Sequence, residues 1–409
     1  MDALEVWIHG AQVGLLERFP DENYRFSFNT IWLEDPRRPL LGQIFEDRRP
    51  YPMETSGLPC WFSHLLPQPD GPLHKLLQRE ARDRSFVDED GDPTDFHLLA
   101  MVGEDLPGAT VLLSGERATP LRRGQTAQAP PKHVSDGLYP SLAGNQLKLT
   151  VVESDRDFTV PVSGRTGRWI AKFANPNYPD LPRWEQATTM WAREAGLQTP
   201  ETRLARVEDL RGLPEGYPTQ GAVFVTRRFD RTDLGRVSME DFAQILDRPP
   251  PNGFFRGSVE EIAAVVAALC PGDLPEMILR VVFCALSREQ DGHLKNWSVL
   301  YPDRRNASLS PAYDLVSGVA YTGNPHKGEM VLPIGGSRRF EDLRESSFEA
   351  IARLTGRDGA ELGRMARDAS ERIRAAWTRI ASDLPLVDAE RVRLSRHLDS
   401  VPLGTASLR

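Results

Sequence analysis

A polar loop around residue 290 carries four side chains that could act together in one reaction. Asp291, His293, Lys295 and Asn296 lie within six positions, between an apolar segment and the strand-like residues 299–301. Burying so many polar groups is costly unless each has a partner. In phosphoryl transfer an aspartate accepts the proton of the attacking hydroxyl, and an asparagine a few residues later binds Mg²⁺. The spacing Asp-x4-Asn therefore favours phosphoryl transfer; the alternative is a solvated loop between a helix and a strand.

A second acidic residue, Asp314, follows in the largely apolar segment Pro-Ala-Tyr-Asp-Leu. On its own it would be interpreted as a turn or helix-capping aspartate. Together with Asp291 and Asn296 it gives three hard oxygen groups, which suit Mg²⁺ and not zinc. The sequence thus predicts that Asp314 binds the metal as well.

The strand-like segment 169–173 contains one lysine, Lys172, among apolar residues. An inward-facing lysine is costly unless it is paired, so a phosphate group would be a suitable partner. Glu185 opens the next helical segment and could form an ion pair with Lys172. The alternative is a half-exposed strand with a surface lysine, followed by a glutamate that the helix dipole favours.

Two glycine-containing segments could bind phosphate through backbone N–H groups. Residues 163–167 precede the lysine strand, and their pattern is more typical of a hairpin turn. Residues 141–148 combine small residues with a lysine and form the second candidate. No GxxxxGK[ST] motif occurs in the chain, so the sequence does not support a Walker-type NTPase.

The composition excludes several classes of protein. The 409 residues include 50 Lys plus Arg against 58 Asp plus Glu, a net charge of −8, which argues against a free-standing nucleic-acid binder. Three cysteines without a CxxC pair argue against a disulfide framework or a thiolate metal site and fit a reducing cytoplasm. No apolar run of about 18 residues occurs, so we expect no membrane segment.

The elements that must position these side chains form a sheet-rich and then a helical pattern. Residues 1–115 predict short strands and a few helices, with a hairpin over 6–16, and the polar residues 116–139 predict a linker or loop. Residues 140–237 predict strands at 146–152, 168–173 and 222–229 and a helix at 184–196. Residues 238–409 predict helices at 239–246, 259–269, 274–287, 347–383 and 386–397. The expected fold class is α+β.

Five ordered motifs resemble those of one family. They are Ser-Leu-Ala-Gly-x-Gln-x-Lys at 141–148, the lysine strand at 169–173, Arg-Phe-Asp-Arg at 228–231, Asp-Gly-His-x-Lys-Asn at 291–296 and Pro-x-Tyr-Asp-Leu at 311–315. In order and spacing they resemble the HipA-type serine/threonine kinase toxins of toxin–antitoxin systems. Leu-Leu-Pro at 65–67 and residues 102–105 extend the resemblance to the N-terminal stretch.

The resemblance implies an ATP-dependent protein kinase with a kinase-like two-lobed fold. Residues 1–115 would form an extra N-terminal α/β subdomain, 140–237 a small mixed N-lobe and 238–409 a mainly helical C-lobe. The implied roles are a catalytic base at Asp291; Mg²⁺ ligands at Asn296 and Asp314; ATP contacts at Ala143, Gly144, Asn145, Gln146, Leu147, Lys148, Lys172, Arg227, Arg228, Phe229, His293, Lys295 and Tyr313; a supporting ion pair at Glu185; and autophosphorylation at Ser141.

The resemblance also implies partners. The substrate would be a protein, glutamyl-tRNA synthetase or another translation factor, and phosphate on Ser141 would repel bound ATP. A small helix-turn-helix antitoxin would bind the chain, which would reach DNA only through that complex. The expected location is cytoplasmic, without a membrane.

The chain departs from the family pattern at a few positions. Arg227 stands where glutamate is usual, and Glu289 and Gln290 precede Asp291 where smaller or uncharged residues are common. None of these changes removes a catalytic group, so an active enzyme is favoured over a pseudokinase. Two alternatives remain: a non-catalytic co-repressor, in which Arg338 could contact the DNA backbone, and a small-molecule kinase on the same fold.

Overall fold

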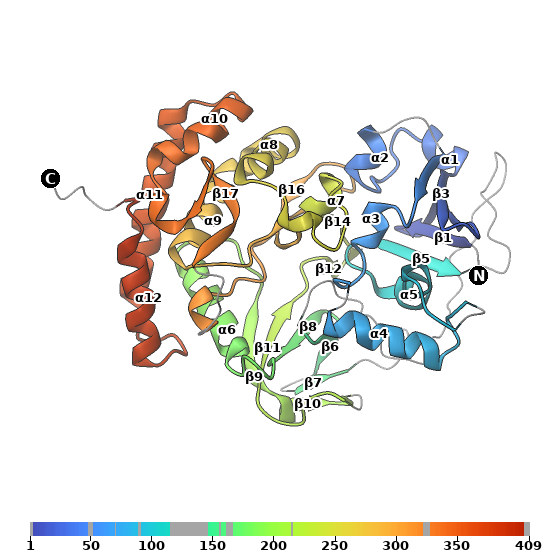
Figure 1. The fold of residues 1–409 in the computed structure, drawn as a ribbon, viewed down its shortest axis with the longest axis horizontal. Coiled ribbons are helices and arrows are strands. Elements are labelled where there is room, and N and C mark those ends of the chain that lie inside the picture. Colours follow the sequence, from blue (N-terminus) through green and yellow to red (C-terminus); the bar gives the residue numbers. More distant parts are fainter. Residues whose placement is uncertain are drawn as a thin grey trace.

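A computed structural model describes residues 3–47, 52–69, 71–88, 91–114, 146–154, 157–160, 167–213, 216–321 and 328–404. We call residues 3–114 the N-terminal part, 146–237 the central part and 238–404 the C-terminal part (Figure 1). The predicted linker at 116–139 lies outside the described residues, as do Ser141, Ala143, Gly144 and Asn145. Among the described residues no helix is long and apolar enough to cross a membrane.

The N-terminal part is an antiparallel sheet with helices packed against it. Its strands are ordered β4-β3-β2-β1-β5, and a turn at His9 and Gly10, both with positive φ, joins β1 to β2 as the predicted hairpin requires. The strands are β1 Ala3–Ile8, β2 Ala11–Arg18, β3 Asn23–Phe28, β4 Met53–Ser56 and β5 Thr110–Ser114. The helices are α1 Thr30–Glu34, α2 Gln43–Asp47, α3 Cys60–Ser63, α4 Pro72–Asp83, α5 Asp95–Val102 and the 3₁₀ helix η1 Gly103–Asp105.

The central part is a sheet in the order β10-β7-β6-β8-β11-β9, with helix α6 packed against β8, β9 and β11. Apolar residues of β6, β7, β8 and β11 form its core. The elements are β6 Lys148–Ser154, β7 Asp157–Thr159, β8 Trp169–Phe173, α6 Leu181–Glu194, β9 Thr202–Arg206, η2 Val207–Asp209, β10 Leu210–Arg211, β11 Ala222–Arg227, β12 Arg231–Thr232 and β13 Gly235–Arg236.

The C-terminal part is mainly helical and has the largest core, to which α6 also contributes. Helices α6 and α11 pack together, and α11 lies on α9. The elements are β14 Ser238–Asp241, α7 Phe242–Ile245, η3 Gly253–Phe255, α8 Val259–Leu269, η4 Pro271–Asp273, α9 Leu274–Leu286, η5 Leu294–Asn296, β15 Ser298–Tyr301, β16 Ser308–Leu309, η6 Gly318–Ala320, β17 Glu329–Ile334, β18 Ser337–Arg339, η7 Phe340–Asp342, η8 Glu345–Phe348, α10 Glu349–Thr355, α11 Gly359–Ile380 and α12 Asp388–Ser400.

Two predicted helices differ from the structure. Residues 239–246 divide into strand β14, which pairs with β15, and the short helix α7, because the Asp241 side chain caps the helix by accepting from Gln244 N. The predicted helix 347–383 is interrupted between α10 and α11. Gly356 ends α10 in the left-handed conformation (φ 67°), and Asp358 caps the start of α11.

A buried ion-pair network joins the N-terminal part to the central part. Asp230 accepts hydrogen bonds from Arg228 Nε at 2.9 Å, Arg231 Nη1 at 2.7 Å and Gly108 N at 2.9 Å. Both arginines also bind Asp105, at 3.0 and 2.9 Å. Burial would raise the pKa of Asp230, but the two guanidinium groups outweigh it and hold that pKa below its usual range. The segment that follows β11 is therefore attached to the N-terminal part.

Candidate active site

A cavity of about 1010 Å³ lies where the three parts meet. His64 and Pro107 of the N-terminal part line it, together with residues of the other two parts. Nearly all of the described residues predicted for the site line this cavity: Gln146, Lys148, Lys172, Glu185, Arg227, Arg228, Phe229, Asp291, His293, Lys295, Asn296, Tyr313 and Asp314. Leu147 is the exception; it packs against the core of the central part, because neighbouring residues of an extended chain face opposite sides.

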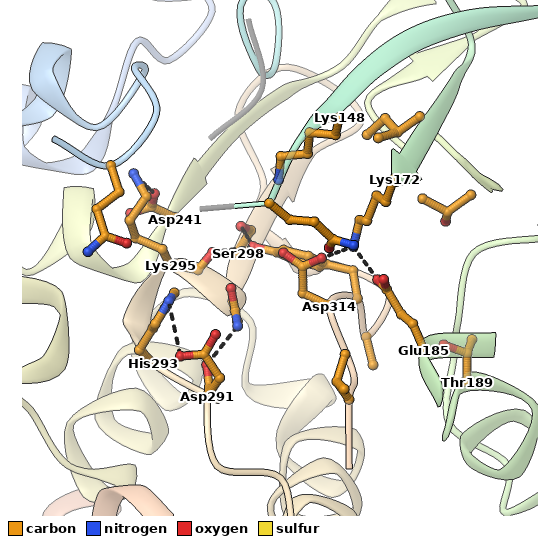
Figure 2. Close-up of a pocket in the computed structure, with 18 of the residues that line it drawn as sticks. Lys148, Lys172, Glu185, Thr189, Asp241, Asp291, His293, Lys295, Ser298 and Asp314 are labelled. Carbon is orange, nitrogen blue, oxygen red and sulfur yellow. Dashed lines mark hydrogen bonds and ion pairs between the residues drawn. The ribbon is translucent and has the colours of Figure 1, made fainter. Parts of the chain in front are cut away.

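Two lysines on neighbouring strands of the central sheet line the cavity side by side. Lys148 of β6 is the register partner of Lys172 of β8, and Lys172 is in turn the partner of Phe224 of β11. Both lysines are buried, and like charges directly opposite one another on a sheet are destabilising. Figure 2 shows both side chains extending from neighbouring strands into the cavity. This arrangement favours an anion in front of the two strands.

The two lysines differ in their partners. Lys172 Nζ donates to the carboxylates of Glu185 and Asp314, so it links α6 to the segment after β16 (Figure 2). Lys148 Nζ makes no hydrogen bond or ion pair with any other described residue. Burial lowers the pKa of Lys148 to about 8, and the charge of Glu185 opposes that shift only in part. A bound anion would be the oppositely charged partner that Lys148 does not have among the described residues.

The loop after α9 places Asp291 on the opposite side of the cavity. The Asp291 side chain is 59% exposed, so an external molecule can reach its carboxylate. Asn296 Nδ2 donates to Asp291 O at 2.8 Å, and this hydrogen bond closes the loop. The His293 ring packs against Phe254 and Phe255, with centroids 4.8 and 5.2 Å away. Burial lowers the pKa of His293 although Asp291 opposes the shift, which favours a neutral imidazole.

The backbone of Asp314 has an uncommon conformation. Its φ of 55° is in the left-handed region, which aspartate tolerates better than most residues because its short side chain can bond locally. Among the described residues no group of three or more His, Cys, Asp or Glu side chains could hold a metal. Asn296 and Asp314 could therefore bind Mg²⁺ only with further oxygen atoms from phosphate or water, which is the usual arrangement for that ion.

Tyr313 and Lys295 connect this loop to its surroundings. Tyr313 Oη donates to Lys295 O at 2.7 Å and lies 2.6 Å from Ser298 Oγ, and its ring packs on Phe229 with centroids 5.3 Å apart. Lys295 Nζ lies 2.8 Å from His64 O, 3.2 Å from His64 Nδ1 and 3.5 Å from Asp241 Oδ2. Lys295 is thus held by the N-terminal part in this structure.

Several residues that line the cavity carry no motif in the sequence. Ile170 lines it from the same face of β8 as Lys172, and Thr226 from the same face of β11 as Phe224. The two-residue alternation of a strand could have predicted Ile170 once Lys172 was assigned. Met239 also lines the cavity. Its position could not be predicted, because residues 239–246 were expected to form a helix and Met239 instead lies in strand β14. Arg338, considered above for DNA, lies on the cavity wall as well.

Two family models match the chain. The HipA N-terminal domain matches residues 4–113, and the HipA-like C-terminal domain matches residues 140–377. Two proteins of Sinorhizobium fredii are similar over nearly their whole length. "Putative kinase Y4dM" is 34% identical, covering 98% of this chain and 97% of that protein, and the similarly named Y4mE is 26% identical, covering 99% and 98%.

A solved structure shares the fold. It is a HipA chain of Shewanella oneidensis in a complex with HipB and its operator DNA, with a TM-score of 0.68 and 18% sequence identity. The match covers 98% of this chain and 96% of that chain. The predicted α+β, kinase-like fold is thereby confirmed.

Proposed function

The chain belongs to the HipA family, and on that premise we propose that it is an ATP- and Mg²⁺-dependent serine/threonine protein kinase acting as the toxin of a toxin–antitoxin pair. The names of the S. fredii relatives support kinase activity. The residues of the cavity support ATP as the phosphate donor and Mg²⁺ as the metal.

One observation carries the proposal: Lys172 lies between two carboxylates while the unpaired Lys148 faces it across the sheet. A surface lysine pair would not need this arrangement. In phosphoryl transfer, however, lysine contacts the phosphates and a glutamate of the adjacent helix holds that lysine in place. The residues fit a nucleotide phosphate because the buried cation Lys148 has no partner among the described residues.

Each residue then has a distinct task. Lys148 and Lys172 bind the phosphates of ATP, and the backbone of Arg227 to Phe229, which lines the cavity, contacts its adenine. Asn296 and Asp314 would hold Mg²⁺, which when bound neutralises charge on the phosphates. Asp291 is the exposed carboxylate, so it accepts the proton of the acceptor hydroxyl as that oxygen attacks the terminal phosphoryl group.

The proposal also includes an antitoxin partner and a protein substrate. The Shewanella HipA chain is in a complex with HipB and operator DNA, and by analogy we propose a small DNA-binding antitoxin for this chain. Its net charge of −8 supports DNA contact through such a partner and not directly. The proposed substrate is a translation factor such as glutamyl-tRNA synthetase, and Ser141 is the proposed autophosphorylation position.

Incubation with radiolabelled ATP and Mg²⁺ tests the proposal. We expect the wild-type chain to label itself on Ser141 and to label a protein in a cell lysate. Asp291→Asn and Asp314→Asn should reduce labelling by about 100-fold or more, because each removes a group that acts in the transfer. Asp303→Asn, which changes an exposed carboxylate in a surface turn, is the matched control.

Two results would contradict the proposal. One is undiminished labelling by Asp291→Asn, which would show that Asp291 is not the catalytic base. The other is a wild-type chain that binds ATP but labels only a small molecule, which would favour the alternative kinase class.

A further inference from the structure

Glu289 lies two residues before Asp291, yet its side chain does not face the cavity. It is buried, with 3% of the residue exposed. Its backbone N donates to Cys284 O at 2.8 Å, and Glu289 forms an isolated β-bridge with Ser317. The carboxylate therefore lies between the end of α9 and the segment that follows Asp314.

Both oxygens of this carboxylate accept hydrogen bonds from backbone N–H groups. Oε1 accepts from Asp291 N at 2.7 Å, and Oε2 accepts from Val316 N at 2.5 Å. Val316 is two residues beyond Asp314, on the same short segment. A single side chain thus joins the backbone beside the proposed base to the backbone beside a proposed metal ligand.

Among the described residues this carboxylate has no cationic partner that would offset its burial. The ionisable groups that act on it or are affected by it are Cys284 of α9, Asp291 of its own loop and Tyr321 after η6, and none of them is a cation. Burial raises the pKa of Glu289 to about 8, and the charge of Asp291 adds to the shift. Near pH 7 the group is then mostly the uncharged acid, in which each oxygen keeps a lone pair that can accept from a backbone N–H.

The two segments would stay adjacent without Glu289. Gly318 N donates to Arg288 O at 2.7 Å, and Gly318 approaches this loop so closely that an added Cβ would meet Arg288 O at 2.6 Å. The backbone contact sets the distance between the segments. The carboxylate additionally fixes the orientation of the peptide groups at Asp291 and Val316.

We propose that Glu289 is a positioning residue that sets the orientation of Asp291 relative to Asp314 through its two backbone hydrogen bonds. This inference rests on the proposed kinase function.

Steady-state kinetics of Glu289→Gln and Glu289→Ala test the role. Glutamine keeps one oxygen as acceptor and turns its NH₂ group toward the other N–H, whereas alanine removes both acceptors. We expect kcat to fall roughly 10-fold in the glutamine variant and roughly 100-fold in the alanine variant. KM for ATP should change less than about twofold, because Lys148 and Lys172 are untouched. A smaller folded fraction would also lower the apparent kcat at constant KM, so kcat is calculated per folded molecule, with the folded fraction of each variant measured by circular dichroism.

Glu260→Gln is the matched control. Glu260 is also buried and accepts a backbone N–H, from Gly335 at 2.6 Å, but it does not line the cavity. Its variant should lose a similar amount of thermal stability and keep the wild-type kcat. Amide hydrogen exchange at Asp291 and Val316 gives a second measurement, which needs no catalysis: both amides should exchange faster in Glu289→Ala.

The outcomes separate this inference from the function itself. An active wild-type chain with unchanged kcat in Glu289→Ala, or unchanged exchange at both amides, overturns the role of Glu289 alone. A folded wild-type chain that transfers no phosphate overturns the proposed function and with it the positioning role.

Discussion

At the scale of single residues, the facing pair Lys148 and Lys172 distinguishes this cavity from an ordinary cleft. Lys172 is neutralised by two carboxylates, while Lys148 has no polar partner among the described residues. A buried ammonium group in this position releases its proton more easily than usual. The charge on Lys148 should therefore depend on whether an anion is bound.

We expect the affinity for ATP to fall as the pH rises above about 8. The pKa of Lys148 is lowered to about 8 by burial, so the ammonium loses its charge there, whereas bound phosphate would raise the pKa and retain the proton. Binding near pH 8 should thus take up protons, which calorimetry in buffers of different ionisation enthalpy measures. Lys148→Met should weaken binding roughly 10-fold and abolish the uptake.

Lys75→Met provides the control for this experiment, since Lys75 is exposed on α4 and does not line the cavity. Proton uptake that persists in Lys148→Met would assign the titration to another group.

Sequence could predict which residues are chemically unusual but not how they face each other. The polar loop at Asp291 and the lone lysine of the β8 segment stand out from apolar neighbours. The pairing of Lys148 with Lys172 depends on strand register. A shift by one residue would place the Lys148 side chain on the opposite face of the sheet. The exposed fraction of Asp291 and the left-handed backbone of Asp314 likewise require coordinates.

At the scale of elements, strand β14 shows how tertiary contacts override a local pattern. Residues 239–246 have apolar residues at helical spacing, so a helix was predicted. The first three of these residues, 239–241, instead pair with β15, which buries Glu240 at the boundary with the N-terminal part. Long segments rich in apolar residues, such as α6, α8 and α9, form helices as predicted, because the burial of many apolar side chains dominates there.

Glu240 gives this boundary a pH dependence. Its carboxylate accepts hydrogen bonds from Gln43 N at 3.0 Å, Trp61 Nε1 at 3.2 Å and the Tyr301 hydroxyl, and burial raises its pKa to about 7. Ionisation is thus harder in the folded than in the unfolded chain. The folded chain therefore loses stability as the pH rises from about 4.5 to 7, by at most about 3.5 kcal/mol at about 1.4 kcal/mol per pH unit.

Glu240→Gln tests this sign. The variant should be less stable than wild type near pH 5, because its NH₂ group faces a donor, and the deficit should narrow by about pH 8 since glutamine does not titrate. Urea unfolding at the two pH values measures the difference. Glu54→Gln, an exposed carboxylate paired with Arg25, should show no such change; a deficit for Glu240→Gln that is constant with pH would refute the account.

At the scale of the whole molecule, the N-terminal part contributes to the active-site wall. His64 of this part accepts from Lys295, which lies next to the proposed metal ligand Asn296. The motifs predicted the N-terminal part, but no pattern in residues 1–115 predicted that it reaches the cavity. Contacts between segments more than two hundred positions apart leave no periodic signal in a sequence.

Two variants of His64 separate the two hydrogen bonds of its ring, while the hydrogen bond from Lys295 to the backbone oxygen of His64 remains in both. Burial lowers the pKa of His64 to about 4, so the ring is neutral; Nε2 donates to Arg248 O at 2.6 Å, and Nδ1 accepts from Lys295. Asparagine places a polar atom near the position of Nδ1, and glutamine places one near Nε2. We expect His64→Asn to retain phosphoryl transfer and His64→Gln to lose roughly 10-fold in kcat.

His74→Asn, which changes another buried histidine of the same part bonded to Asp95, controls for lost stability. Equal kcat values for His64→Asn and His64→Gln would mean that the hydrogen bond from Lys295 to Nδ1 of His64 does not position the loop.

The attachment of the N-terminal part to both neighbours has a consequence for motion. It binds the segment after β11 through Asp105 and Arg228, and it binds the C-terminal part through Gln43 and Glu240. Two bodies joined at one hinge keep a rotational degree of freedom. A third body bonded to both sides makes a closed linkage, in which rotation at one joint must be matched at the others. Opening of the cavity must therefore break one of these junctions or occur within a part.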